Sequence, residues 1–443
     1  MRPRGWIQDS GSFENLIKVV ELFDKNSTTN KLLTNKFIRD KVLNLDCQEY
    51  LVKSLLNEDG YKNNPLIEYK ALVGSRTNKE EVDGLIQVLI PGQSRLGIVD
   101  WACDNFIRLA YTFNYLQYSE KNDSFSITEV GLKLANANNL EEKFEIIKHS
   151  LLSYPPVTRI LELLNVQYQN SQEPSLTKYE IGRELGFKGE AGFTSYSQKT
   201  VVHALSCAES NPERTKIKNN WEGSSDKYAR MISKWLCHNQ VGWVQTARKK
   251  ITVQIGEKKF TSQLKSYQIT LEGIKIFKLS RAHSRHPGVE KSVGFEMLST
   301  KENARNFLRL RRAYILTSIK NTKNLAQIQD YLKANSMNAV SCETIKDDLD
   351  NFARIGLDIA FSNNKYKIRD KIINLEIPQD FTEEDSQPDY IERSKDMLRK
   401  YLEKLDHGYL DMLDLGASGR KKSRLFETRI VDLLKADSTH KCN

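Results

Sequence analysis

The chain has 443 residues, and its 67 lysines and arginines against 57 aspartates and glutamates give a formal net charge of +10. At about 150 residues per domain, this length predicts about three domains. No stretch approaches the ~20 apolar residues that a membrane-spanning helix needs, and residues 1–9 lack the apolar core of a signal peptide, so we expect a cytoplasmic protein.

The first clear element is a helix that leads into a β-hairpin. Residues 100–111 have the spacing of an amphipathic helix. Residues 115–118 and 125–128 alternate as strands do, and the polar residues 119–123 between them predict a turn. A helix followed directly by a hairpin is the second half of a winged helix-turn-helix.

A sequence pattern that begins in this hairpin occurs twice. Residues 124–134 and 266–276 both match Ser-[Phe/Tyr]-x-Ile-Thr-x-x-Gly-[Leu/Ile]-Lys-[Leu/Ile], and residues 365–369 keep only its aromatic-x-Ile part. Amphipathic helices near 225–236 and 341–352 precede the second and third copies. We therefore predict a mainly helical α+β fold with three tandem winged helix-turn-helix units. Winged helices can also serve only to pack against other proteins, so DNA binding is not expected of all three.

Further helices and breaks divide the chain. Thr177 and Glu180 form a capping box at the start of a helix, and residues 326–332 are the equivalent helix of the third unit. The proline pair at 155 and 156 and the segment 281–288 mark boundaries. We predict units at 1–154, 155–282 and 283–378, then an acidic linker and a helical segment at 379–443, with helices at 391–405 and 425–434.

Metal-ligand patterns are missing from the sequence. The six cysteines lie far apart without a Cys-x-x-Cys pair, which argues against a zinc ribbon or a disulfide framework. The closest histidines, His283 and His286, fall in the segment that we interpret as a linker. We therefore expect no metal site in this chain.

The most informative window is 216–232, followed by the rest of one helix. Ser224 or Ser225 can cap this helix. Its apolar and basic positions each follow helical spacing: Tyr228, Met231, Ile232 and Trp235 on one face, and Lys227, Arg230 and Lys234 on another. This places a basic stripe on the second helix of a helix-turn-helix, which is the helix that enters the major groove.

The chemistry of this window suits base edges. Lys227 and Arg230 can donate to guanine O6 and N7, and Glu222 can accept from cytosine N4. Asn219 can pair with a base edge. A solvated helix face remains the alternative for the basic stripe, but a carboxylate beside phosphates needs a specific donor, so Glu222 favours base readout.

The same window resembles the second recognition subdomain of the FokI-like type IIS restriction endonucleases. The likeness is carried by Asn-Asn-Trp-Glu-Gly-Ser-Ser-Asp-Lys-Tyr-Ala-Arg-Met-Ile at 219–232 and by shorter matches, in order, between residues 5 and 436, among them Gly5-Trp6-x-Gln8, Leu72-Val73-Gly74, Ala191-Gly192-Phe193-Thr194-Ser195 and Arg311-Arg312-Ala313. The resemblance implies a bacterial restriction-modification enzyme whose first two subdomains read the asymmetric site 5′-GGATG-3′ in double-stranded DNA. The third subdomain would mainly hold the nuclease domain through protein contacts.

The resemblance also implies base-contacting residues. In the second subdomain these fall on Asn219, Glu222, Lys227 and Arg230, all of which are kept. In the first they fall on Gln8, Asp9, Arg76, Gln93 and Trp101. Asp9 stands where the family has Asn, and a carboxylate cannot donate to a base, so the bases read by the first subdomain could differ.

Phosphate contacts would make DNA affinity fall steeply with salt. The candidates are Lys216, Lys218, Lys234, Arg305, Arg309 and Arg312. The three arginines could equally face a nuclease domain.

The nuclease of this family is a PD-(D/E)-x-K domain that holds Mg²⁺. The match continues through residues 430–436 and then breaks, without the catalytic strands, in a way that resembles a frameshift or an artificial end. Pro388-Asp389 lacks a suitably spaced acid-x-Lys downstream. We therefore expect no catalytic residue here, and Mg²⁺ only in a nuclease domain that another chain could supply.

Two alternatives stay open. One is a complete Mg²⁺-dependent endonuclease with an unrecognised catalytic site. The other is a winged-helix transcriptional regulator, which the lack of a ligand-binding or dimerisation segment weakens. We expect a monomer that binds double-stranded DNA and neither a membrane nor a small-molecule substrate.

Overall fold

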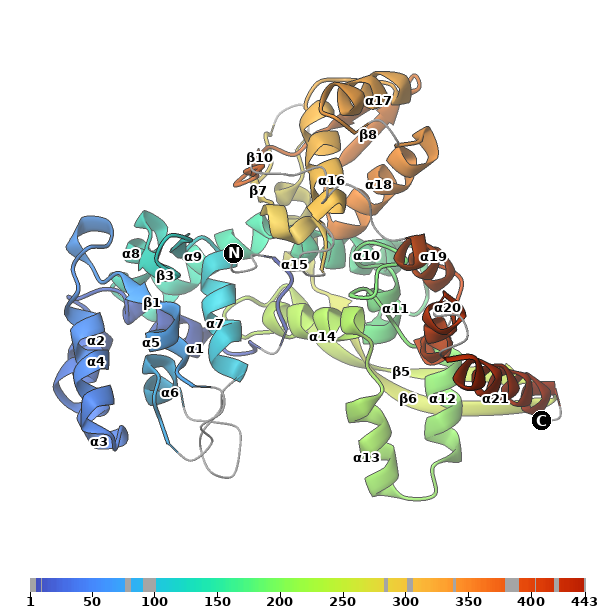
Figure 1. Ribbon diagram of the computed structural model, residues 1–443, viewed down its shortest axis with the longest axis horizontal. Coiled ribbons are helices and arrows are strands. Elements are labelled where there is room, and N and C mark those ends of the chain that lie inside the picture. The colour runs from blue at the N-terminus through green and yellow to red at the C-terminus, as the bar shows by residue number, and fades with distance from the viewer. Residues whose placement is uncertain are drawn as a thin grey trace.

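The computed structural model describes residues 5–8, 10–75, 81–90, 101–282, 286–300, 306–337, 340–378, 390–402, 404–417 and 422–441. The chain is mostly helical, with small sheets, and its helices gather in three units that follow one another along the sequence (Figure 1). A C-terminal group of helices, red in Figure 1, lies beside the second unit. The predicted α+β fold class is confirmed.

The first unit is helical around a three-stranded antiparallel sheet of order β1-β3-β2. Its elements are α1 (Phe13–Glu21), α2 (Thr28–Leu32), η1 (Leu33–Phe37), α3 (Ile38–Lys41), α4 (Leu45–Leu56), η2 (Tyr61–Asn63), β1 (Ile67–Glu68), α5 (Tyr69–Val73), α6 (Leu85–Leu89), α7 (Trp101–Thr112), β2 (Leu116–Ser119), β3 (Ser124–Ile127), α8 (Glu129–Ala135) and α9 (Leu140–Ser153). The predicted helix at 100–111 and the hairpin that follows it correspond to α7, β2 and β3.

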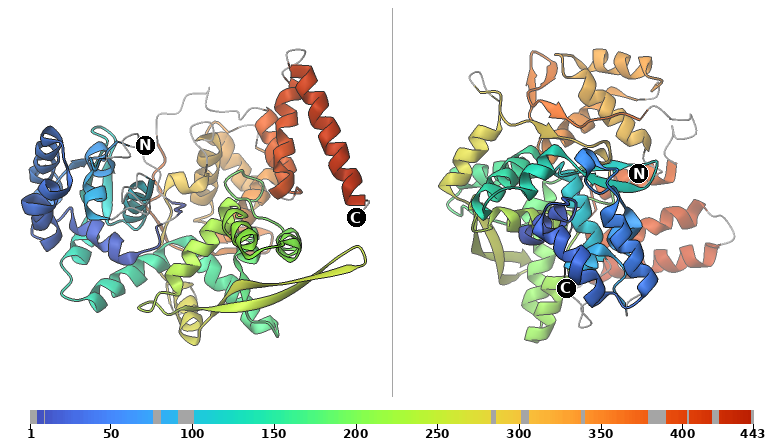
Figure 2. Two further views of the ribbon diagram at one scale, coloured as in Figure 1. Left: turned by 90° about the horizontal axis from the view of Figure 1, so that it is seen from below. Right: turned by 90° about the vertical axis from the view of Figure 1, so that its left-hand side faces the viewer.

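The second unit contains a hairpin far longer than those of its neighbours, and Figure 2 shows it projecting from the body of the molecule. The elements are α10 (Pro155–Asn170), β4 (Leu176–Thr177), α11 (Lys178–Arg183), α12 (Gln198–Cys207), α13 (Asn211–Asn220), α14 (Ser224–Leu236), β5 (Val244–Ile255), β6 (Lys258–Ile269) and α15 (Leu271–Ser280). The sheet order is β4-β6-β5, antiparallel throughout. The sequence did not predict the length of this hairpin.

The third unit and the C-terminal helices complete the chain. The third unit comprises β7 (Lys291–Ser292), η3 (Phe295–Leu298), α16 (Asn306–Ser318), α17 (Leu325–Ala334), α18 (Cys342–Ile355), β8 (Ile359–Ser362), β9 (Lys365–Ile368) and β10 (Ile372–Ile373), and the C-terminal group comprises α19 (Tyr390–Arg399), η6 (Lys404–Leu410), α20 (Asp411–Ala417) and α21 (Ser423–Lys441). The helix predicted at 391–405 is therefore wrong at its end, because α19 stops at Arg399.

The repeated sequence pattern forms the same junction in the first two units. Thr128 caps α8 by accepting from the Gly131 N–H at 3.0 Å, and its hydroxyl donates to the Tyr115 carbonyl at 3.1 Å. A Cβ on Gly131 would lie 2.2 Å from that carbonyl oxygen. Thr270, Gly273 and Trp243 take the same three roles in the second unit. The Thr and Gly of the pattern thus let a helix start pack directly on the first strand of a hairpin.

The units share one core. A single cluster of buried apolar residues runs from Trp6 to Ile368 through all three. The predicted break at Pro155 and Pro156 is a buried helix junction, because α9 ends at Ser153 and α10 begins at Pro155. Tyr154 lies inside this junction and donates to the Gly5 carbonyl at 2.8 Å. Packing, and not only the connecting chain, therefore fixes how the units sit.

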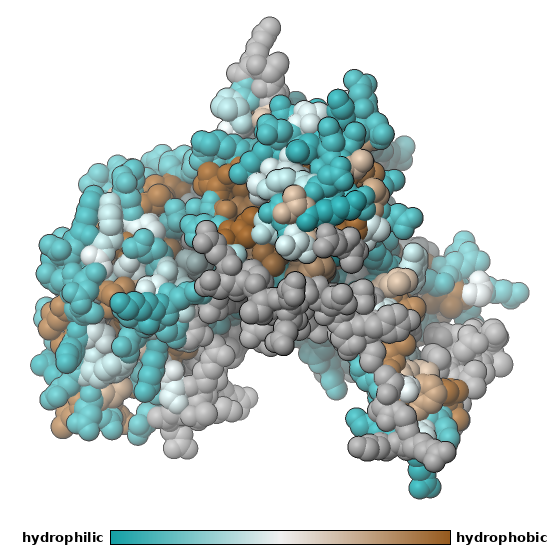
Figure 3. All heavy atoms as spheres, turned by 45° about the horizontal axis from the view of Figure 1, so that its top comes forward, coloured by the Kyte–Doolittle hydropathy of each residue, from teal (hydrophilic) through white to brown (hydrophobic). Residues whose placement is uncertain are grey.

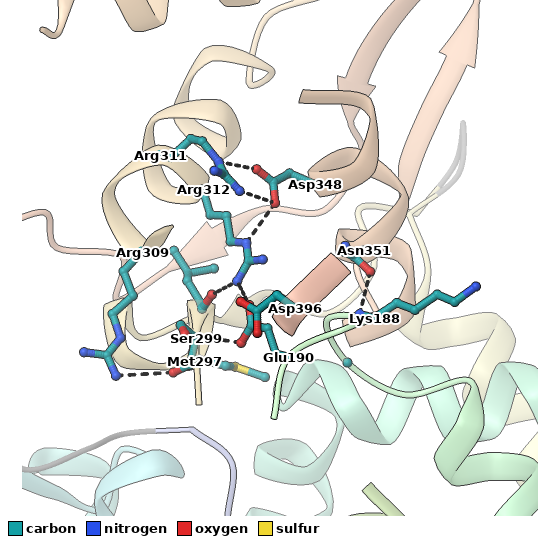
Figure 4. A network of polar contacts seen from close by, with 12 residues as sticks. Lys188, Glu190, Met297, Ser299, Arg309, Arg311, Arg312, Asp348, Asn351 and Asp396 are labelled. Atoms are coloured by element: carbon teal, nitrogen blue, oxygen red, sulfur yellow. Dashed lines mark hydrogen bonds and ion pairs between the residues drawn. The ribbon is translucent and has the colours of Figure 1, made fainter. Parts of the chain in front are cut away.

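A buried ion network joins the second unit to the third, as Figure 4 shows. Arg312 on α16 is 4% exposed, pairs with Glu190, and donates to Asp348 at 2.9 Å. Arg311 donates to the other oxygen of Asp348 at 2.7 Å. The guanidinium of Arg312 also stacks over Phe187, 3.7 Å from the ring centroid. Arg312, which we expected at a phosphate, is thus enclosed by protein, and that expectation is wrong because two carboxylates already neutralise and bury its charge.

The face in Figure 3 is mainly hydrophilic, with apolar patches between the units. Within the described residues, no helix is both long enough and apolar enough to cross a bilayer.

Candidate nucleic-acid interface

Helix α14, the predicted recognition helix, begins at a tightly built corner. Gly223 is its N-cap, and Asp226 accepts from the Gly223 N–H at 2.7 Å and from the Tyr196 N–H at 3.2 Å. Asp226 also accepts from the hydroxyl of Ser195. We expected a serine cap, which is wrong because Gly223 holds the cap position: Asp226 accepts from its N–H, and Thr194 accepts from the N–H groups of Ser224 and Ser225. Burial raises the pKa of Asp226 to about 7, against three hydrogen bonds that lower it.

The back of α14 packs as the sequence predicts. Tyr228, Met231, Ile232 and Trp235 are all buried. This face meets the N-terminal arm of the first unit: the Trp6 and Tyr228 rings lie 5.1 Å apart, and the Trp235 indole donates to the Ser10 carbonyl at 2.8 Å. Gln8 makes a hydrogen bond with the Tyr228 hydroxyl. The arm that carries a candidate of the first unit therefore lies directly against the recognition helix of the second.

A charged triad lies at the front of α14: Arg230 belongs to this helix, Glu222 precedes it, and Lys178 begins α11. The Glu222 carboxylate, 6% exposed, accepts from Lys178 Nζ at 2.5 Å and from Arg230 Nε at 2.8 Å. A second bond joins Arg230 Nη2 to the other carboxylate oxygen at 3.3 Å. The Lys178 and Arg230 side chains are 15% and 37% exposed, so Arg230 is the member of the triad that most faces solvent.

The triad has a net positive charge. Burial alone would raise the pKa of Glu222, but the hydrogen bonds and charges of Lys178 and Arg230 lower it below its usual value. Burial lowers the pKa of Lys178, while Glu222 partly opposes this. Two cations therefore share one ionised carboxylate, which fixes the direction of the Arg230 guanidinium.

This triad opens into a basic cleft of about 720 Å³ between helices α11, α13 and α14 and the long hairpin. The cleft is lined by Lys178, Tyr179, Lys218, Arg230, Thr246, Ala247, Arg248, Gln263, Leu264, Lys265 and Tyr267. Five of these side chains are cationic and none is acidic, although Glu222 lies just behind Lys178 and Arg230. A polyanion is the ligand class that such a surface attracts.

The remaining candidates of the second unit lie on α13 and α14. Asn219, Lys216 and Lys218 are exposed on the last turns of α13, just ahead of the triad. Lys227 is half-buried on the first turn of α14. Lys234 is exposed further along the helix, and its Nζ lies near Gly11 of the N-terminal arm. Of these residues, Lys218 lines the cleft, and Lys216 and Asn219 lie on the same end of α13.

The candidates of the first unit are less completely placed. Gln8 is half-buried. Asp9, Arg76, Gln93 and the phosphate candidate Arg305 lie outside the described residues, as does the side chain of Trp101 at the start of α7. Arg309 lies on α16, away from the cleft, and donates to the Ser299 carbonyl at 3.3 Å.

Sequence reasoning missed four contributors to this site. Lys178, Arg248 and Lys265 line the cleft, and Asp226 fixes the helix start. The absence of any Asp or Glu within 244–255 and 258–269, where six cations occur, was a signal that could have pointed to the hairpin. Lys178 had no local signal, because Glu222 lies 44 residues away.

The described residues hold no group of three or more His, Cys, Asp or Glu side chains that could bind a metal ion. The Mg²⁺ that phosphodiester cleavage would use has no matching ligand set among them, and we assign it no step.

Comparison with known proteins identifies relatives for the whole chain. Models of the FokI recognition domain match residues 2–137 as subdomain 1 and residues 143–283 as subdomain 2, and a FokI D3 domain model matches residues 298–364. The chain is 34% identical to the type II restriction enzyme FokI of Planomicrobium okeanokoites, over 98% of this chain and 74% of that enzyme. It is 32% identical to the type II restriction enzyme StsI of Streptococcus sanguinis, over 95% of this chain and 69% of that enzyme.

Solved structures give the same result. The structure of restriction endonuclease FokI superimposes with a TM-score of 0.78 at 33% identity, over 97% of this chain and 73% of that one. The structure of FokI bound to DNA superimposes with a TM-score of 0.77 at 32% identity, over the same shares of both chains.

Proposed function

The chain belongs to the FokI family of type IIS restriction enzymes and recognises double-stranded DNA in a sequence-specific manner, and we propose that the triad on α14 and the end of α13 read part of its site. The single observation that carries this assignment is the fixed Arg230 guanidinium, held by the buried Glu222 at the mouth of a basic cleft.

The triad can read a G·C pair without being taken apart. Arg230 carries five N–H donors, and two of them bond to Glu222, which orients the guanidinium at the mouth of the cleft, where its geometry matches the O6 and N7 acceptors of guanine. Glu222 lies behind Lys178 and Arg230, so it would accept from cytosine N4 only if it turned away from these two cations. A preset guanidinium costs less side-chain entropy on binding than a mobile one.

Asn219 and Lys227 would extend this readout to neighbouring bases. Asn219 lies on the last turn of α13 and Lys227 on the first turn of α14, so both flank the triad. Lys216 and Lys218 would bind phosphates from the exposed side of α13. We propose 5′-GGATG-3′ as the site, with the first unit reading the remaining bases through Gln8, Asp9, Arg76, Gln93 and Trp101.

We also propose that one chain occupies each asymmetric site and that recognition itself needs no Mg²⁺. We further propose that a nuclease domain carried by another chain is the partner for cleavage. The cationic side chains of the cleft attract the phosphates of DNA directly, so binding does not depend on a metal ion.

The test is a competition binding assay on two duplexes, one with GGATG and one with the same bases scrambled. We expect at least ~10³-fold tighter binding to the GGATG duplex in the presence of EDTA. Equal affinity for the two duplexes would contradict the proposed site. Nicking of the DNA after Mg²⁺ is added would instead favour a complete metal-dependent endonuclease.

A further inference from the structure

The long hairpin of the second unit has one fully polar, basic face. Strands β5 and β6 have 12 residues each, which corresponds to about 40 Å of extended chain. Their exposed pairs are Arg248 with Lys265, Lys250 with Gln263, Thr252 with Thr261, and Gln254 with Lys259. Neither strand contains an acidic residue.

The other face of the hairpin is fixed to the protein. Ile251 and Leu264 are buried in a small core with Val201, Val202 and Leu205 of α12. Lys249 points to the same side, where its Nζ donates to Glu180 at 2.8 Å. Because side chains alternate along a strand, this anchoring forces Arg248 and Lys250 to the solvent.

The basic face begins at the site that reads bases. Arg248 and Lys265 lie opposite each other on the ladder and both line the cleft that contains Arg230. From Lys265 to Lys259 the strand runs six residues away from the cleft, which corresponds to about 20 Å. Within the described residues, no carboxylate pairs with Arg248, Lys250, Lys259 or Lys265.

We propose that this face of the hairpin binds the phosphate backbone of the duplex that flanks the recognition site, on one side only and for about six base pairs beyond the bases read at the cleft. The inference rests on the proposed function, because it takes Arg230 as the point where the duplex is held. Lysine, arginine, threonine and glutamine side chains are phosphate ligands that carry no sequence information. A reach of about 20 Å corresponds to about six base pairs at 3.4 Å per pair.

The experiment measures affinity for a set of duplexes that all contain the GGATG site. One flank is kept at two base pairs while the other is lengthened in steps of two up to twelve, and then the flanks are exchanged. We expect affinity to rise with length on one side until about six to eight base pairs and then to level off, and to rise much less on the other side.

The test variant is Lys250→Gln with Lys259→Gln, which removes two charges from the solvent face. The matched control is Lys365→Gln with Lys367→Gln, which removes two exposed charges from the hairpin of the third unit. On the long duplex we expect the test variant to bind about tenfold more weakly and the slope of log affinity against log salt to become less steep by about 1.8. The control should match the unsubstituted protein.

The outcomes separate this inference from the proposed function. If the test variant keeps the affinity and salt slope of the control, or if the two flanks contribute equally, the hairpin does not bind flanking DNA and the inference is overturned. Specific binding to the shortest duplex would then still support readout by α14. Loss of all preference for the site in the unsubstituted protein would instead overturn the proposed function.

Discussion

Replacing Arg312 by methionine should destabilise the protein strongly but leave the salt dependence of its DNA affinity unchanged. Arg312 is the charged partner of Glu190, whose side chain is 5% exposed, whereas Asp348 would keep its bond to Arg311. Methionine preserves an apolar side chain over Phe187 but leaves a carboxylate buried without its cation. Breaking a buried pair in this way costs about 3–5 kcal/mol.

The measurement is the free energy of unfolding by urea for the unsubstituted protein, for Arg312→Met, and for Arg312→Met combined with Glu190→Gln. We expect a loss of about 3–5 kcal/mol in the single variant and recovery of about 1–3 kcal/mol when the second change removes the unpaired charge. A loss below ~1 kcal/mol, or no recovery in the double variant, would refute this reasoning. If the slope of log affinity against log salt became less steep by about 0.9 in Arg312→Met, Arg312 would contact a phosphate after all, in contradiction to its buried position.

Two further predictions concern the second unit. Burial raises the pKa of Asp226 from 3.8 to about 7, so the stability from this group is complete below the unfolded pKa and is lost as the pH rises through the folded pKa. The free energy of unfolding should therefore decline by about 2–3 kcal/mol from pH 5 to pH 8, and Asp226→Asn should lack this decline. Identical pH profiles for the two proteins would refute this prediction. Gly273→Ala should cost well over the ~0.5 kcal/mol of an ordinary surface change, since the new Cβ would lie 2.1 Å from the Trp243 carbonyl oxygen, whereas Lys275→Ala on the same helix should cost little. A thermal melt that ranks the two variants equally would contradict this account of the repeated pattern.

The sequence predicted those parts of the fold that depend on local patterns. The capping box of Thr177 and Glu180, the apolar spacing of α14 and the short hairpin of the first unit each involve residues close in the chain, and all are confirmed. The repeated pattern is visible in the sequence, but its cause is visible only in the structure: its Thr and Gly allow the start of a helix to pack against a backbone carbonyl.

The predictions that failed concern residues whose surroundings depend on contacts with residues distant in the sequence. Arg312 looks like a surface cation until Glu190, 122 residues away, is placed beside it. The length of the hairpin in the second unit was not predicted because its alternation includes Lys249 on the buried side, where the contact with Glu180 makes a lysine acceptable. The predicted base-reading residues Glu222 and Arg230 are close to each other in sequence, but Lys178, which completes their triad, reaches them only through the fold.

The most direct test of the central claim is a selection of bound sequences from random duplexes by the unsubstituted protein, by Arg230→Ala, and by Arg369→Ala as a control on an exposed arginine of the third unit. If α14 reads bases, Arg230→Ala should lose about 1–3 kcal/mol of discrimination at one guanine and keep its preferences elsewhere, and Arg369→Ala should change nothing. An Arg230→Ala protein that selects the same site with undiminished preference at every position would contradict the account.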